Sequence, residues 1–487
     1  MNPLWTLVPP LAVVPFIILF GEKRRNLREA SIIVAGLLLL LINNQIYRDV
    51  VAGMTPQSGE FALLADYSLK LSAEPMGVLF GLLASFLWVV TTVYSIGYMR
   101  GHHEINQTRF YTCFALALAA VMTAAYADNL LTLFVAYELI TISTFPLVTH
   151  AGGEAARKGG RVYIGILMTT SIGFLLPAII WTATVSGTLD FQVGGVLADA
   201  GLSKGAMAVL LALFVFGIAK AGLMPFHRWL PAAMVAPTPV SALLHAVAVV
   251  KTGVFSVLKI VTYTFGIDTI TMTGAAQWLL PVTAFTVIAA SLVAFTKDNL
   301  KARLAYSTIS QLAYIVMAAL LATVMSVSGG VLHIVMHAFG KITLFFCAGA
   351  IMVALHKSEI SKMNGIGRRM PLTMGAFFIG AVSIIGLPPA GGVWSKLLIA
   401  GGSIDTGTLI WAAVLMLSTI LNIAYLLPIP LRAFMRADPD LAPGEQASWQ
   451  EAPFACLWAI ALTTISCIAL FIYPQPLTEL IGLIQWR

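Results

Sequence analysis

Long apolar segments follow one another along almost the whole chain, and they constrain its fold more than any other feature. Only 10% of the 487 residues are charged, whereas a soluble domain carries about 25% charged residues. So little charge cannot cover a water-facing surface, so the sequence predicts an all-α polytopic membrane protein. About fourteen segments have spanning length, and they begin near Leu4, Ile32, Gly77, Tyr111, Leu130, Val162, Ala206, Val240, Trp278, Leu304, Val331, Pro371, Thr408 and Pro453.

The distribution of Lys and Arg supports this count and predicts an orientation. Loops that follow the odd-numbered segments hold 19 basic residues, whereas the alternate loops hold 4. Basic residues concentrate in cytoplasmic loops, so we expect both termini outside the cell (inner) plasma membrane. The same loops explain the net charge of +7, and we expect no nucleic-acid partner. The first segment lacks a basic stretch before it, which favours a retained helix over a cleaved signal peptide.

The loops between the segments are short. The longest cover about 48–76 and 437–451, so we expect no catalytic site and no cofactor within this chain, and any redox or hydrolytic chemistry must occur in another subunit. We also expect no metal site, because the cysteines have no metal-ligand spacing and are typical of small buried hydrophobic residues. They are Cys113, Cys347, Cys456 and Cys467.

Five ionisable residues lie well inside apolar segments: Glu138, Lys220, Lys251, Lys341 and Lys396. Each costs about 2.5–3.5 kcal/mol at mid-membrane, and such residues usually face the bundle interior or a water-filled path. Static ion pairs and snorkelling lysines are the alternative, although snorkelling works only near helix ends. Four lysines face one glutamate, and burial disfavours the charged form of a lysine, so part of the set should exchange protons. A partner subunit could instead supply the missing carboxylates.

Histidines accompany the lysines. In HIVMHAFGKITLFF, the residues His333, His337 and Lys341 are spaced i, i+4, i+8 and share one helix face. Three proton-capable groups in one stripe favour a proton relay. Haem ligation by two histidines is a weaker alternative, because it normally needs facing histidines on separate helices. Since His245 could face the stripe, that alternative stays open.

Two segments combine a lysine with helix-breaking residues. Lys220 lies just before one such group and Lys396 just after another; the breaking residues are Gly222, Pro225, Pro388, Pro389, Gly391 and Gly392. Unwound backbone at membrane depth is tolerated only where protein or water satisfies it. Matching interrupted segments in two halves are typical of a transport site.

These breaks fall in segments 7 and 12, five segments apart, and an odd repeat inverts the topology. We therefore expect two five-helix inverted repeats, segments 4–8 and 9–13, each a proton half-channel with a broken helix. The corresponding division is 1–109 for helices 1–3, 110–265 and 266–436 for the two repeats, and 437–487 for helix 14. In this alignment of the repeats, Asn422 and Tyr425 are uncharged counterparts of Lys251.

The motifs in these segments resemble the proton-conducting subunits shared by Mrp cation/proton antiporters, respiratory complex I and membrane-bound hydrogenases. The resemblance covers roughly residues 110–434 and includes the serine-containing motif of Ser310. It rests on FVAYELITISTFPLV, KAGLMPFHRWLP, APTPVSALLHA, HAVAVVKTGVF, KARLAYSTISQLAY, HAFGKITLFF and GLPPAGGVWSKLLI. Lys396 and the run LSTILNIAYLLPI look most like the D-type subunits of Mrp antiporters.

This resemblance implies a larger membrane complex that moves H⁺ and possibly Na⁺ or K⁺. It further implies a switchable pair of Glu138 with Lys220, lateral transfer through the middle of the bundle, and exit at Lys396. His245, His333, His337 and Ser310 would support the relay. The open alternatives are a proton-pumping subunit of a complex I-like NADH-quinone oxidoreductase or hydrogenase, and a membrane scaffold that conducts nothing.

Overall fold

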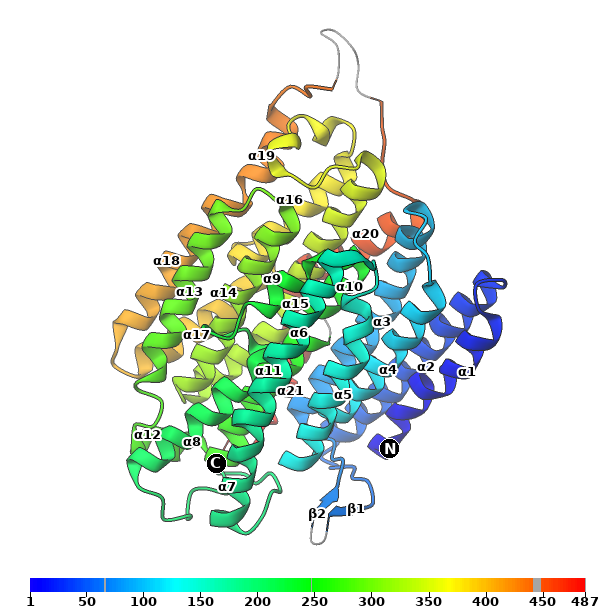
Figure 1. The fold of residues 1–487 in the computed structure, drawn as a ribbon. Helices are drawn as coiled ribbons and strands as arrows, with labels where there is room; N and C mark the ends of the chain where they lie inside the picture. Colours follow the sequence, from blue (N-terminus) through cyan, green and yellow to red (C-terminus); the bar gives the residue numbers. More distant parts are fainter. Residues whose placement is uncertain (65–66, 247, 441–447, 487) are drawn as a thin grey trace.

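The computed structural model describes residues 1–64, 67–246, 248–440 and 448–486. Almost all of this part is helical, and most of the long helices run in a similar direction (Figure 1). The helices are α1 Val8–Phe20, α2 Arg25–Val51, α3 Pro75–Gly101, α4 Gln107–Ala125, α5 Leu130–Val148, α6 Gly153–Thr170, α7 Leu176–Ser186, α8 Lys204–Gly217, α9 Trp229–Ala232, α10 Thr238–Ala246, α11 Val249–Ile260, α12 Ile267–Thr273, α13 Leu279–Thr296, α14 Leu300–Leu320, α15 Val324–Leu355, α16 Pro371–Ile385, α17 Gly392–Asp405, α18 Leu409–Leu426, α19 Pro428–Met435, α20 Phe454–Ile472 and α21 Gln475–Gly482.

Ten helical segments in these described ranges are long and apolar enough to cross a membrane. They coincide with predicted segments 1 to 6, 9, 11, 13 and 14: Pro3–Phe20, Arg25–Val51, Pro75–Gly101, Gln107–Ala125, Leu130–Val148, Gly153–Ser186, Leu279–Thr296, Val324–Leu355, Leu409–Met435 and Phe454–Ile472. Segments 7, 8 and 12 are broken, and segment 10 is α14, whose first turn carries Lys301 and Arg303. The polytopic helical fold is confirmed, and the number fourteen remains a prediction.

A small hairpin departs from the purely helical prediction. Strands β1 (Phe61–Leu64) and β2 (Tyr67–Leu69) pair antiparallel in the loop between α2 and α3. The hairpin lies at the same end of the molecule as the N-terminus (Figure 1). Strands are possible here because the loop is polar and projects beyond the apolar helices.

The 32-residue helix α15 forms the centre of the second half of the molecule. It packs against α10, α14, α16, α17 and α20, and its residues from Val327 to Ile351 are almost all buried. Such all-round burial is typical of a core helix. Close packing depends on small residues: a Cβ on Gly329 would lie 2.8 Å from the backbone nitrogen of Ile399 on α17. The predicted stripe of His333, His337 and Lys341 therefore lies inside the protein.

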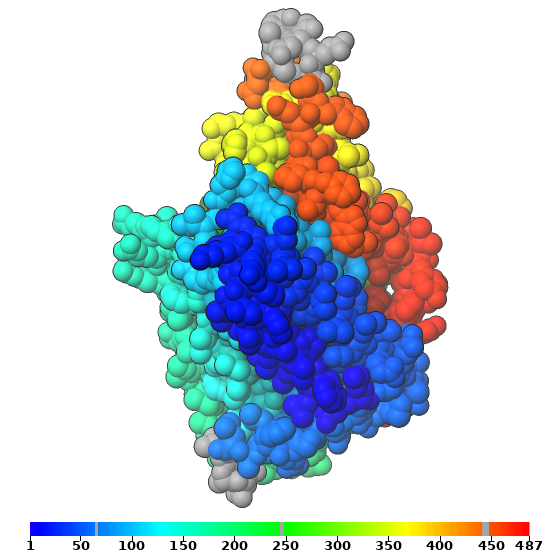
Figure 2. All heavy atoms as spheres, turned by 90° about the vertical axis from the view of Figure 1, so that its right-hand side faces the viewer, coloured from blue at the N-terminus to red at the C-terminus, as the bar shows by residue number. Residues whose placement is uncertain are grey.

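The N-terminal helices cover one side of the bundle. Figure 2 shows α1 and α2 in dark blue across this face. Only 33% of the apolar window of each is buried within the chain, and large apolar residues such as Leu19 and Leu41 are exposed there. This surface therefore fits the apolar interior of a bilayer or another membrane subunit.

Helix interruptions occur at both predicted places. Helix α8 ends at Gly217, and the breaking residues Gly222 and Pro225 lie in the irregular stretch before α9. Gly222 has φ of +71°, a left-handed conformation that suits glycine because it has no Cβ. Helix α16 ends at Ile385 and α17 begins at Gly392, so the other breaking residues lie between these helices or at the first residue of α17.

A third interruption was not predicted. Segment 8 is split into α10, which ends at Ala246, and α11, which begins at Val249. No proline or glycine marks this position in HAVAVVKTGVF, so composition gave no signal. The side chain of His245, a predicted relay residue, lies outside the described part of the structure.

Candidate functional site

Lys220 lies in the first interruption and is completely buried. Its ammonium donates hydrogen bonds to the carbonyl oxygen of Tyr137 (2.8 Å) and to Oγ1 of Thr141 (2.6 Å), both on α5. The same Nζ lies 3.1 Å from the centre of the Tyr137 ring, which attracts a cation. The broken backbone is held as well, because the Trp229 indole donates to the carbonyl of Ala219 at 2.9 Å. The break thus points a buried amine at α5.

Glu138 does not form the direct ion pair with Lys220 that the resemblance implied. Neither carboxylate oxygen has a hydrogen-bond partner among the described residues. Tyr137 and Thr141 are four residues apart and present one face of α5 to the lysine, whereas Glu138 is rotated by about 100° from Tyr137. The glutamate is therefore close in sequence to the lysine's partners, yet it is not one of them in this conformation.

Lys251 and His337 form a direct contact between α11 and α15. The lysine Nζ lies 2.5 Å from Nδ1 of His337, and both side chains are buried, at 0% and 1% exposure. The sequence placed these residues on separate segments and predicted no particular contact between them. An amine and an imidazole at this distance can pass a proton directly.

His333 continues the stripe one helical turn before His337. The two imidazole rings lie 5.8 Å apart. Nδ1 of His333 is bonded to the Ser395 hydroxyl (2.8 Å) and Nε2 to Oε1 of Gln311 (3.1 Å). Because both nitrogens are engaged, this histidine is not available as an axial haem ligand in this conformation. A hydrogen-bonded position beside a second histidine suits proton transfer instead.

Lys341 lies one turn after His337 and is also completely buried. Its ammonium donates to Oγ of Ser307 at 2.6 Å. Ser307 in turn accepts a hydrogen bond from the Tyr425 hydroxyl (2.9 Å), which also donates to Asn422. A polar network therefore joins α15, α14 and α18. The sequence gave Asn422 and Tyr425 no role in it.

Lys396 lies at the second interruption and is less buried than the other three lysines. Its ammonium donates to the carbonyl of Ile385 (2.9 Å), the last residue of α16, and to Oγ1 of Thr419 (3.4 Å). The cation also lies 4.9 Å from the centre of the Tyr314 ring. That ring stacks on His333 at 5.9 Å, so aromatic packing joins the end of the histidine stripe to the second break.

Ser310, the predicted supporting hydroxyl, lies beside this path and not in it. It bonds with Ser291 (2.9 Å), with Ser418 (3.4 Å) and with the carbonyl of Val287 (2.9 Å). These contacts join α13, α14 and α18. Because none of these three partners is a lysine or a histidine, the geometry gives Ser310 a packing role.

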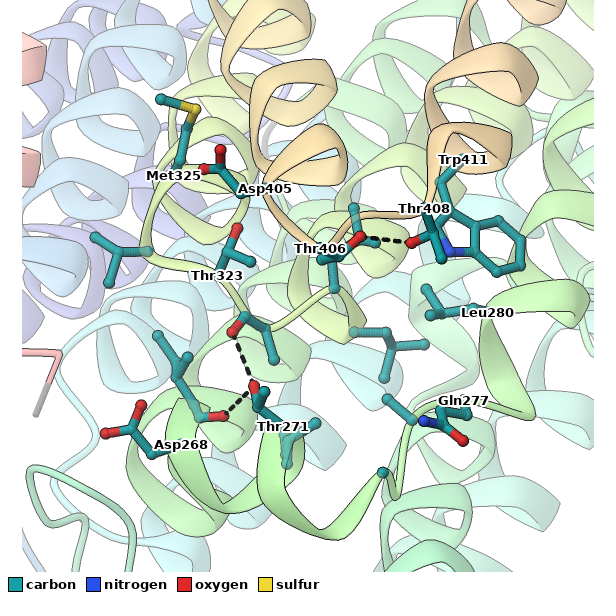
Figure 3. A pocket seen from close by; sticks show the side chains of 18 of the residues that line it. Asp268, Thr271, Gln277, Leu280, Thr323, Met325, Asp405, Thr406, Thr408 and Trp411 are labelled. Carbon is teal, nitrogen blue, oxygen red and sulfur yellow. Dashed lines mark hydrogen bonds between the residues drawn. The ribbon is translucent and has the colours of Figure 1, made fainter.

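The largest cavity described lies away from these residues. It has a volume of about 1010 Å³ and lies among α12, α13, α17, α18 and the turn between α14 and α15 (Figure 3). Asp268, Asp405, Thr323 and Trp411 are among its lining residues. None of the predicted site residues lines it, although Leu398, two residues after Lys396 on α17, does.

Sequence reasoning missed two kinds of residue. The hydrogen-bond and aromatic partners of the lysines and of His333 were the first kind: Tyr137, Ser307, Gln311, Tyr314 and Ser395. Single polar residues in apolar segments carry little signal, because hydroxyls often bond to their own helix. The second kind was a buried lysine, Lys259, which was counted among the loop residues although it is 2% exposed.

The comparisons with known proteins agree with this geometry. A family model described as "NADH:quinone oxidoreductase/Mrp antiporter, TM" matches residues 127–422, which is more than half of the chain. The chain belongs to this family. The matched region contains Glu138, Lys220, Lys251, Lys341 and Lys396.

Two curated relatives show the range of this family. Chain 5 of an NAD(P)H-quinone oxidoreductase from Synechocystis sp. is 30% identical over 433 residues, which make up 81% of this chain and 60% of that protein. Hydrogenase-4 component B from Escherichia coli is 32% identical over 350 residues, or 68% of this chain and 50% of that protein. This chain thus spans only half to three fifths of these relatives' lengths.

Two solved structures share the fold over nearly their whole length. A chain of the Mrp complex from Dietzia sp. has a TM-score of 0.85 at 21% identity. A chain of the archaeal membrane-bound sulfane sulfur reductase, a respiratory membrane complex, has a TM-score of 0.85 at 23% identity. In both comparisons 99% of this chain and 96% of the other are covered. Both neighbours are parts of membrane complexes, which is consistent with other membrane subunits as partners.

Proposed function

We propose that this chain translocates protons as a membrane subunit of a multisubunit monovalent cation (Na⁺ or K⁺)/proton antiporter. The observation that carries the proposal is the Lys251–His337 contact at 2.5 Å, with His333 and Lys341 one turn away on either side. Buried amines and imidazoles in one stripe are costly in a membrane interior, and such groups mark ion pathways.

The proposed path begins at Lys220 and ends at Lys396. A movement that brings Glu138 toward Lys220 would favour the ammonium form, and a movement away would favour release of its proton. Lys251, His337 and Lys341 would carry the proton sideways, with water filling gaps between them. His333 and Tyr314 lead from this stripe to Lys396.

Lys396 would pass the proton to the side opposite the basic loops. The cavity of about 1010 Å³ supports this exit, because Leu398 on the same helix lines it. The proposed orientation places the basic loops in the cytoplasm and both termini outside. The two halves around Lys220 and Lys396 would work as inverted repeats, 110–265 and 266–436.

The coverage of the solved structures favours the antiporter over a redox-driven pump. The chain and its Mrp neighbour cover each other at 99% and 96%, whereas the quinone oxidoreductase and hydrogenase relatives extend well beyond it. The names of those relatives favour the second candidate, a proton-pumping subunit of a redox complex. The archaeal neighbour matches it in length, too.

Everted membrane vesicles that contain the whole complex separate these candidates. Addition of Na⁺ or K⁺ is expected to collapse a respiration-generated pH gradient, recorded with a pH-sensitive dye. In an assembled Lys396→Ala complex the response should fall at least about tenfold, since proton transfer by a positioned group contributes about 10²–10⁴-fold. No cation response in the wild type would favour the redox-driven pump. A normal response in the assembled variant would indicate a scaffold or another path.

A further inference from the structure

A second group of buried charges lies at the end of the molecule that carries the N-terminus and the β-hairpin. Lys259, near the end of α11, is 2% exposed. Its ammonium lies 2.7 Å from a carboxylate oxygen of Glu74, at the start of α3, and donates to the carbonyl of Ala127 at 2.5 Å. The next residue after Ala127 is Asp128, a second carboxylate.

These residues line a cavity of about 330 Å³, which we name the outer vestibule. Its wall includes Glu74, Asp128, Phe191, Lys259 and Tyr263. A single water molecule occupies about 30 Å³ of liquid, so the vestibule has room for several. The ion pair is therefore not sealed in apolar packing, and it faces a space that water can enter.

A thin apolar layer separates the vestibule from Lys220. A second cavity of only about 10 Å³ lies there, lined by apolar side chains that include Leu133 and Ile260, and by the polar residues Tyr137 and Ser256. Its volume suffices for about one water molecule. Tyr137 contacts Lys220, and Ser256 lies one helical turn before Lys259. The layer therefore joins the vestibule to the first buried lysine through two polar residues.

Asp128 is the vestibule group best suited to exchange a proton. It lies between α4 and α5, outside the spanning helices. Burial raises its pKa above the ordinary value, and the charges of Asp190 and Glu74 raise it further, whereas Lys259 and Lys70 lower it. The protonation of Asp128 therefore depends on the charge of Lys259.

We propose that the outer vestibule is a second proton-exchange site, which connects the first half of the bundle to the side opposite the basic loops. Asp128 takes a proton from vestibule water and gives it back, and no other bond changes. Lys259 and Glu74 are positioning residues, because they act through Asp128. This inference rests on the proposed function, since it requires protons to move through the Lys220 region.

The test varies the pH on one side of the membrane at a time. Proton flux through the whole complex is measured in right-side-out and in everted vesicles, with the lumen buffered and reported by a pH dye. In Lys259→Met, loss of the positive charge should move the pH profile up by about one unit or more, in the single orientation that exposes the vestibule to the bath. In Asp128→Asn the dependence on that side should disappear.

Glu60→Gln is the matched control. It removes a carboxylate that pairs with Lys70 at 3.0 Å on the same face but outside the vestibule, and it should keep the wild-type profile. Should Lys259→Met fail to assemble, wild-type complex can be treated with a water-soluble carbodiimide. The Asp128 carboxyl should react from the vestibule side, as shown by mass spectrometry, and absence of reaction would overturn the proposal.

The outcomes separate this inference from the proposed function. If assembled Asp128→Asn and Lys259→Met keep the wild-type profile while Lys220→Ala loses proton flux, the vestibule proposal is wrong and the lysine path stands. If Lys220→Ala also transports normally, both are wrong. A shift in both orientations would indicate a general structural change, and this too would contradict a one-sided port.

Discussion

Replacement of Lys251 by alanine is expected to lower complex-dependent proton flux by roughly 100-fold, the lower range for a positioned proton-transfer group. The reason is geometric. Its Nζ lies 2.5 Å from His337 and is the described link between α11 and the stripe on α15. Alanine removes the amine and leaves a gap that one water molecule must bridge without a fixed orientation. Flux is measured as dye-reported acidification, with assembly checked by co-purification of the other subunits.

Lys251→Arg distinguishes a proton carrier from a fixed positive charge. A guanidinium keeps the charge but does not lose its proton in proteins, so this variant should also be inactive. A fixed ion would tolerate it. The matched control is Lys204→Arg, because Lys204 is exposed at the start of α8. Wild-type flux in an assembled Lys251→Arg complex would sink the relay.

Sequence patterns predicted the larger features because these follow from transfer free energies. Apolar length fixes where a helix can span, and ten such segments appear where expected. A charge within an apolar run is costly wherever it lies, so Lys220, Lys251 and Lys341 could be identified as interior residues, and all three are fully buried. The spacing of His333, His337 and Lys341 likewise needs only helical periodicity.

The remaining features depend on contacts between segments that composition does not encode. Helix rotation decides that Tyr137, and not Glu138, contacts Lys220. The break between α10 and α11 contains no proline or glycine, so tertiary packing must stabilise it. Lys259 looked like an interfacial loop residue because it lies at the end of an apolar run, yet Glu74 from a distant loop covers it. Pairing of this kind appears only after the helices are assembled.

Replacement of Gly253 by alanine is expected to disturb the first interruption more than any other single methyl group in that region. A Cβ at Gly253 on α11 would lie 2.4 Å from the backbone nitrogen of Ala221 and 2.4 Å from the carbonyl carbon of Lys220. Backbone atoms cannot rotate away as a side chain can. Overpacking of this kind costs about 1–3 kcal/mol, and a displacement of about 1 Å at a reacting group can lower a rate by about 100-fold.

The displaced backbone is the one that carries Lys220. Its position is fixed by the hydrogen bond of its own N–H to the Tyr137 hydroxyl (3.1 Å) and by the indole of Trp229. We therefore expect Gly253→Ala to lower both the thermal midpoint of the purified complex and its proton flux, the latter by at least about tenfold.

Gly165→Ala is the matched control for this substitution. Gly165 lies on α6, a Cβ there would meet nothing within 4 Å, and alanine favours a helix by about 0.5–1 kcal/mol over glycine. This variant should keep wild-type flux and an equal or higher thermal midpoint. If Gly253→Ala matched it in both measurements, the break would tolerate displacement, and the exact position of Lys220 could not be what limits transfer. Loss in Gly253→Ala alone would mean that close approach of α11 to the broken helix sets the geometry of the first proton-carrying group.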